Sequence, residues 1–122
     1  MSNSPQDLDA WLDHISQAHP QEIELGLGRV RAVYSRMAFS SPPKKKVLVA
    51  GTNGKGSTIA LAEAGLRSQG YKVGCYTSPH ISNYNERVRI GGDNVSDESL
   101  VEAFAYIEQL RGHVKLTYFE FG

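Results

Sequence analysis

The sequence predicts an α/β protein with a parallel sheet flanked by helices. A short apolar run at residues 47–50 leads into a glycine-rich loop and then into a helical segment. A second apolar run follows at residues 71–77. A strand, a helix and a second strand in this order form a crossover unit, and such units join parallel strands. The length of 122 residues suits one domain with a modest core.

Two helices are expected before the loop. Ser4 is the expected cap of the first helix and Pro5 its first residue, and apolar side chains then recur on one face. These are Leu8, Trp11, Leu12 and Ile15. The second helix is expected at residues 27–37, with Leu27, Val30, Val33 or Tyr34, and Met37 facing inward. Residues 39–43 have the composition of a loop.

The expected elements after the loop alternate between helix and strand. A helix at residues 57–68 is closed by Gly70, and a strand at 71–77 holds Cys75 as a buried residue. A polar segment covers residues 78–95. Ser96 then caps a helix that ends at Gly112, and residues 114–119 resemble a third strand. We therefore divide the single domain 1–122 into a helical lead-in (1–45), a phosphate-binding unit (46–77), a substrate and metal loop (78–95) and a final helix and strand (96–122).

Composition excludes several classes of function. Lys and Arg number 13, and Asp and Glu also number 13, so no charge excess points to nucleic acid or to an anionic membrane. No apolar run approaches the roughly 18 residues that a membrane helix needs. The amino-terminal residues lack the basic and apolar blocks of a signal peptide. Cys75 is the single cysteine, and these features together favour a cytoplasmic location.

The loop Gly51-Thr-Asn-Gly-Lys-Gly-Ser57 has the chemistry of a phosphate-binding loop but departs from the usual pattern. In that pattern a glycine stands at position 49 and a hydroxyl residue at 56, whereas this chain has Val49 and Gly56. Glycines let the backbone approach a phosphate, and a lysine adds a positive charge. On these residues alone, a small P-loop kinase or NTPase and a non-catalytic nucleotide-binding module remain open.

Three motifs in order resemble one family. The loop string GTNGKGS resembles the Mur ligase superfamily of ATP-dependent amide-bond ligases, and the glycine after the lysine is similar to its folylpolyglutamate synthase and dihydrofolate synthase branch. The string TSPHISNYNERVRI at 77–90 and the string LTYFEFG at 116–122 are similar to segments of the bifunctional bacterial members. The resemblance implies a Mur-ligase-like central ATPase domain, incomplete in this chain.

The resemblance also implies site residues and ligands. The residues that would bind ATP phosphates are Thr52, Asn53, Gly54, Lys55, Gly56 and Ser57, with Lys55 serving catalysis. Ser78 and Ser57 would offer hydroxyls to Mg²⁺. The segments that would contact dihydropteroate are Glu22, Ile23, Glu24 and Leu25, and Thr117, Tyr118, Phe119 and Glu120. The partners are small molecules (ATP, dihydropteroate or folate, and L-glutamate), with no nucleic acid and no membrane.

Other polar residues near these motifs are expected to be structural. Glu86, Arg87 and Arg89 are expected to hold their loop through ion pairs, and His80 is not assigned to catalysis.

The implied reaction activates a carboxylate as an acyl phosphate, which the amino group of glutamate then attacks. Because the family's members are several times longer, we interpret the chain as the amino-terminal part of such a ligase. We expect it to be inactive on its own.

Overall fold

The computed structural model describes residues 5–19, 26–38 and 45–122. The chain divides into two compact units. The first comprises Met1–Ser40 and Asp97–Gly122, and the second comprises Ser41–Ser96.

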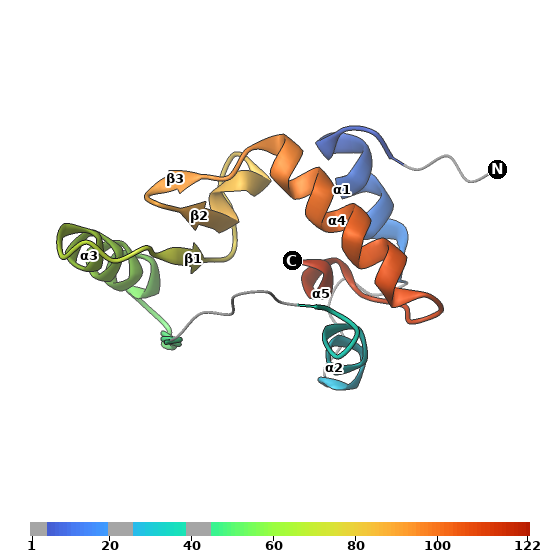
Figure 1. The fold of residues 1–122 in the computed structure, drawn as a ribbon, viewed down its shortest axis with the longest axis horizontal. Helices are drawn as coiled ribbons and strands as arrows, with labels where there is room; N and C mark the ends of the chain where they lie inside the picture. Colours follow the sequence, from blue (N-terminus) through green and yellow to red (C-terminus); the bar gives the residue numbers. More distant parts are fainter. Residues whose placement is uncertain (1–4, 20–25, 39–44) are drawn as a thin grey trace. The chain divides into compact units, whose positions relative to one another are not determined.

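Helices form the described part of the first unit. They are α1 (Leu8–Gln17), α2 (Gly28–Tyr34), α4 (Asp97–Arg111) and the short α5 (Tyr118–Phe121). Helix α4 packs against α1 and α2, and α1 also contacts α5 (Figure 1). Aromatic side chains fill the space between them: the Trp11 and Phe104 rings stack with centroids 6.2 Å apart, and Phe121 meets Phe104 edge-on at 6.5 Å. The core of this unit is therefore built from both ends of the sequence.

The predicted helices of this unit are present, with corrected starts. Helix α1 is capped by Asp7, whose Oδ1 accepts a hydrogen bond of 2.8 Å from the amide of Ala10. The prediction of Pro5 as the first helical residue is therefore wrong, and Ser4 lies outside the described residues. Aspartate caps a helix about as well as serine, which explains how the helix can start later than expected.

Helix α2 is shorter than predicted, and Val33 is its buried residue. Leu27 was expected to face inward but is 63% exposed. It stands at the cap position with the helix beginning after it, so its side chain does not share the inner face.

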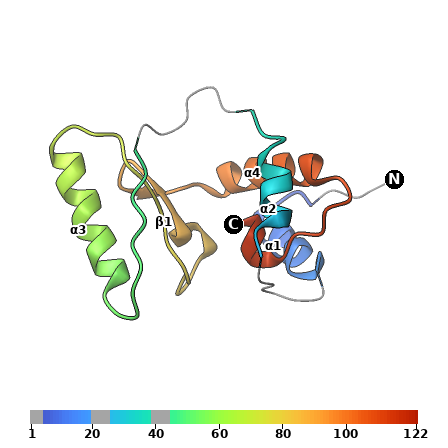
Figure 2. The ribbon, with the colours of Figure 1, turned by 90° about the horizontal axis from the view of Figure 1, so that it is seen from below.

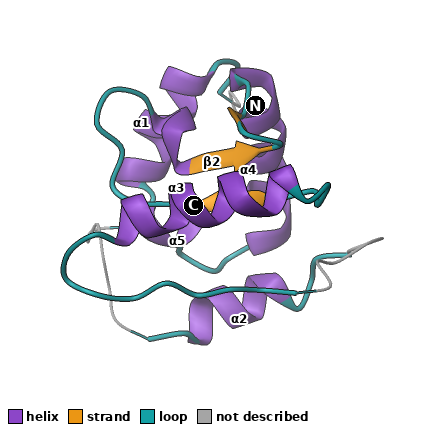
Figure 3. Ribbon diagram, turned by 90° about the vertical axis from the view of Figure 1, so that its left-hand side faces the viewer, coloured by secondary structure: helices purple, strands orange, loops and turns teal. Residues whose placement is uncertain are grey.

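The second unit combines one helix with a small antiparallel sheet. Helix α3 (Lys55–Ser68) ends at a left-handed Gly70, as predicted. Strand β1 (Gly74–Tyr76) pairs with β2 (Val88–Ile90), which pairs with β3 (Asp93–Asn94) (Figure 1). A 3₁₀ turn, η1 (Tyr84–Arg87), precedes β2, which is labelled in Figure 3. Gly91 and Gly92 have φ of 63° and 90°, which allows the tight turn between β2 and β3.

The mixed α/β class is confirmed, but the strand pairing differs from the prediction. The prediction of a strand at residues 47–50 is wrong for this structure: Val47 and Leu48 are 81% and 93% exposed and no strand is formed (Figure 2). Instead, β1 pairs with β2 from the segment 78–95, which was expected to be irregular. A strand exists only through its partners, and the described residues offer none to 47–50.

The predicted strand at residues 114–119 is also wrong. Thr117 caps α5 in a capping box: its Oγ1 accepts from the amide of Glu120 at 3.2 Å, and the Glu120 carboxylate accepts from the amide of Thr117 at 3.0 Å. The Thr-x-x-Glu spacing was visible in the sequence, and this capping preference outweighed the alternating apolar pattern.

Within the described ranges, no helix combines the length and the apolar composition that crossing a membrane would require.

Candidate functional site

The glycine-rich loop leads directly into α3. Gly54 is the cap residue of the helix and adopts a left-handed conformation, with φ of 75°. The first intrahelical bond joins the amide of Thr58 to the carbonyl of Gly54 at 3.0 Å. The amides of Lys55, Gly56 and Ser57 therefore precede that bond and have no acceptor within the helix. Such amides, at the positive end of a 14-residue helix, attract an anion.

The loop is open to solvent on the side that a ligand would approach. Residues 51–58 are all exposed. A Cβ built on Gly54 or on Gly56 meets no atom within 4 Å, whereas one built on Gly51 lies 3.9 Å from the Lys55 Cγ. The Lys55 side chain thus starts across the loop toward Gly51. The predicted phosphate-binding residues 52–57 are therefore all accessible to a ligand, and Lys55 lies among them.

The predicted metal ligands Ser57 and Ser78 are not part of an acidic cluster within the described residues. Ser57 lies in the first turn of α3, and Ser78 lies in the loop after β1; both are exposed. Among the residues that the structure describes, no group of three or more His, Cys, Asp or Glu side chains could hold a metal ion. Mg²⁺ in proteins is usually bound through one or two carboxylates. The described donors therefore do not complete a magnesium site.

Glu86 orders the loop that carries Ser78. Its carboxylate accepts hydrogen bonds from the amides of Ile81 (2.9 Å), Ser82 (3.0 Å) and Asn83 (2.7 Å). These bonds, led by that of Ile81, lower the pKa of Glu86. The residue holds the loop as predicted, but through backbone amides rather than through an ion pair.

The two arginines that follow are also structural. Arg87 is buried; its Nε donates to His80 Nδ1 at 2.8 Å, and its guanidinium lies 5.0 Å from the centre of the Tyr84 ring. Arg89 makes the predicted ion pair, 3.2 Å from Glu63. With Nδ1 accepting from Arg87, any proton on a neutral His80 ring lies on Nε2.

Sequence reasoning missed Glu63. This α3 residue is only 6% exposed, pairs with Arg89 across to β2, and lies beside Cys75 of β1. Burial, followed by the nearby Glu63 carboxylate, raises the pKa of the Cys75 thiol. A buried carboxylate needs a partner, but Arg89 lies 26 residues away in the sequence, and no local pattern connects the two. The pair joins α3 to the sheet.

One of the two predicted dihydropteroate segments, Thr117–Glu120, lies within the described residues. Residues 22–25 lie outside the described residues. Thr117 is fully buried and Tyr118 half-buried, whereas Phe119 is 47% exposed. Glu120 is not free, because it bonds Arg29 of α2 as well as Thr117. The structure thus presents Phe119 to solvent and uses Thr117 and Glu120 internally.

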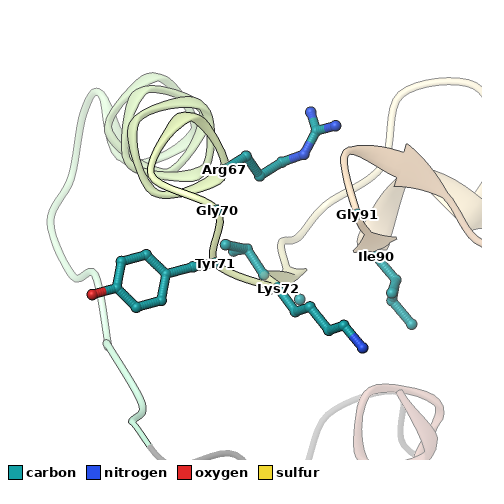
Figure 4. Close-up of a pocket in the computed structure, with 8 residues that line it drawn as sticks. Arg67, Gly70, Tyr71, Lys72, Ile90 and Gly91 are labelled. Atoms are coloured by element: carbon teal, nitrogen blue, oxygen red, sulfur yellow. The ribbon is translucent and has the colours of Figure 1, made fainter.

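An open hollow elsewhere in the second unit is lined by none of the predicted site residues. It is bordered by Arg67 from the last turn of α3, by Tyr71 and Lys72 from the segment after that helix, and by Ile90 of β2 (Figure 4). The lining combines two cationic side chains with apolar surface. No acidic residue is among its lining residues.

Comparison with known proteins identifies close relatives. The chain is 44% identical over 115 residues to the dihydrofolate synthase/folylpolyglutamate synthase of Escherichia coli (strain K12), covering 94% of this chain and 27% of the relative. It is 41% identical over 114 residues to the protein of the same name from Haemophilus influenzae, covering 93% of this chain and 26% of the relative. No family profile matches the chain.

Solved structures agree with the sequence comparison. E. coli FolC in complex with DHPP and ADP superimposes with a TM-score of 0.92 at 41% identity, covering 99% of this chain and 29% of that one. The bifunctional folylpolyglutamate synthase/dihydrofolate synthase from Yersinia pestis, complexed with AMPPNP and Mn ion, gives a TM-score of 0.90 at 47% identity, covering 100% of this chain and 30% of that one.

The fold and the glycine loop together define a segment of a Mur-ligase-like α/β protein. More particularly, the chain belongs to the folylpolyglutamate synthase/dihydrofolate synthase family. It spans about 27% of the length of the E. coli relative.

Proposed function

We propose that the chain supplies the ATP-phosphate loop and part of the dihydropteroate site of an ATP-dependent ligase. This ligase joins L-glutamate to dihydropteroate and to folates, and we propose that it acts in the cytoplasm. The single observation that carries the proposal is the geometry of residues 51–57: an exposed left-handed Gly54 at the start of α3, with Lys55 extending across the loop. The ligands in the relatives' structures, ADP and AMPPNP, support a nucleotide at this loop.

The described residues fit a phosphate group. The amides of Lys55, Gly56 and Ser57 are oriented by the helix, and the space around Gly56 is open. Bound ATP would supply the phosphoryl group that turns a substrate carboxylate into an acyl phosphate. Lys55 would neutralise charge on the transferring group, and the amides would fix its position. Phosphoryl transfer depends mainly on such positioning and charge stabilisation, so no nucleophilic side chain is required.

The described residues do not by themselves fit Mg²⁺. Ser57 and Ser78 offer neutral hydroxyls without a carboxylate cluster. We therefore propose them as contributors to a metal site whose acidic ligands come from outside the described residues, and we assign no step to the ion. The Mn ion in the Y. pestis structure supports a divalent metal in the family's site.

The test is Lys55→Ala in a protein of the family's length that carries this sequence. Removing one charge-stabilising donor from an active site commonly costs about 2–4 kcal/mol of barrier, roughly a 30-fold to 1,000-fold loss of rate. We expect that loss in dihydropteroate- and glutamate-dependent ADP release, with the fold unchanged because Lys55 is exposed. Lys72→Ala, at another exposed lysine of the same unit, should leave the rate unchanged.

Unchanged kinetics in Lys55→Ala would remove Lys55 from the mechanism. ADP release that needs no glutamate would instead favour a small P-loop NTPase, and nucleotide binding without turnover would favour a non-catalytic module. The relatives favour neither alternative.

A further inference from the structure

Glu120 is bound on two sides within the first unit. Arg29 Nε donates to both carboxylate oxygens, at 3.0 and 3.2 Å, and Arg29 Nη2 lies 3.0 Å from Oε2. The amide of Thr117 donates to Oε1 at 3.0 Å. The Glu120 side chain is 6% exposed and the Arg29 side chain 25% exposed. A forked, charge-assisted pair with this burial fixes geometry far better than an exposed ion pair does.

This pair joins two separate parts of the chain. Arg29 lies in the first turn of α2, and Glu120 lies in α5, 91 residues later. Helix α5 has only four residues, too few to be stable through its own hydrogen bonds. Its position therefore depends on the capping box, on the buried Phe121 and on Arg29.

We infer that Arg29 is a positioning residue for the dihydropteroate site, an inference that rests on the proposed function. Arg29 acts through Glu120 and holds the segment Thr117–Glu120 in place. Glu120 then serves the substrate indirectly, because its carboxylate is committed to Arg29 and Thr117. The exposed Phe119 is the side chain that this arrangement leaves available for contact.

The experiment compares Arg29→Met and Arg29→Lys with the unchanged chain. Amide hydrogen exchange of residues 117–121 measures how firmly Arg29 holds α5. A dihydropteroate titration followed by NMR measures binding at the proposed substrate segment. Arg29→Met retains most of the aliphatic stem but loses the fork, so we expect at least tenfold faster exchange at Glu120 and Phe121 and weaker dihydropteroate binding. Lysine keeps the charge without the fork and should restore both only in part. Arg31→Met, at an exposed arginine on the same helix, is the matched control.

The outcomes distinguish the effect of Arg29 on α5 from the assignment of Thr117–Glu120 to dihydropteroate. Unchanged exchange in Arg29→Met overturns the inference. Faster exchange with unchanged dihydropteroate affinity also overturns it, because Arg29 would then be structural only. Absence of dihydropteroate binding by the unchanged chain overturns the proposed substrate segment and the positioning role with it. ADP release by the longer ligase tests the ATP loop independently of all three.

Discussion

At the scale of single residues, Gly56 is the position that most clearly separates ligand binding from folding. It lies inside α3 and does not have a positive φ, and a Cβ built there meets nothing within 4 Å apart from the neighbouring backbone of the helix itself. The fold itself therefore gives no reason for a glycine at this position. A glycine there is explained if a phosphate approaches the backbone closely.

Gly56→Ala should therefore stabilise the chain and weaken nucleotide binding. Replacing a helical glycine by alanine contributes about 0.5–1 kcal/mol. Gly65→Ala, at another helical glycine of α3 with open space around it, is the control: it should give the same gain in stability without a change in nucleotide affinity. Urea unfolding and AMPPNP titration measure the two effects. If Gly56→Ala binds AMPPNP as well as the control does, the close approach to this backbone is refuted.

Glu86 provides a second residue-scale test, through pH. Because the amides of Ile81, Asn83 and Ser82 lower its pKa from 4.5, the ionised form is favoured in the fold. Its contribution to the order of the loop is therefore present above pH 4.5 and is lost as the pH falls through the lower folded-state pKa. We expect the Glu86 carboxyl resonance to titrate with a midpoint below 4.5 in NMR spectra. A midpoint at or above that value would mean that the three hydrogen bonds are not formed in solution.

At the scale of elements, the helices were more predictable than the strands. The periodic apolar residues of α1 and the polar start and glycine end of α4 located both helices. Hydrogen bonds within a helix are local, so a single segment carries the information. Strand pairing is not local: nothing in residues 47–50 says which strand will pair with them, and the sheet formed elsewhere.

In the candidate site, too, local features were predictable from the sequence, whereas long-range pairings were not. The string GTNGKGS predicted an exposed loop before a helix, and the structure has it. The roles of Glu63 and Arg29 were not predictable, because each depends on a partner many residues away in sequence. Glu120 was expected to be a substrate contact on motif similarity alone, and only the structure revealed its bonds to Arg29.

The aromatic core of the first unit gives an element-scale prediction. Phe104 is 2% exposed and stacks on Trp11, whereas Phe119 is 47% exposed. Phe104→Ala should cost about 3–5 kcal/mol through lost burial and the cavity left behind. Phe119→Ala should have little effect on stability. Urea unfolding followed by near-UV circular dichroism measures both, and equal losses in the two variants would contradict the arrangement of α1, α4 and α5.

At the scale of the whole molecule, the proposed phosphate loop is not accompanied by a metal-binding cluster among the described residues. No described cluster of acids or histidines could fix a metal ion. Catalysis by positioning is sensitive to such a loss, since a misplacement of about 1 Å can cost on the order of a hundredfold in rate. We therefore expect nucleotide contact but no dihydrofolate when the purified chain is incubated with ATP, Mg²⁺, dihydropteroate and glutamate. Clear product, with any longer enzyme excluded, would require a different active site.

The most direct test of the central claim is an AMPPNP titration of the isotope-labelled 122-residue chain, followed through its backbone amide resonances. We expect the largest shifts at Gly54, Lys55 and Gly56, with millimolar affinity. Binding should be roughly 10-fold to 160-fold weaker in Lys55→Ala, since a charge-assisted contact contributes about 1.5–3 kcal/mol. The absence of shifts in this loop, or the same affinity in Lys55→Ala, would contradict the assignment of residues 51–57 as the ATP-phosphate site.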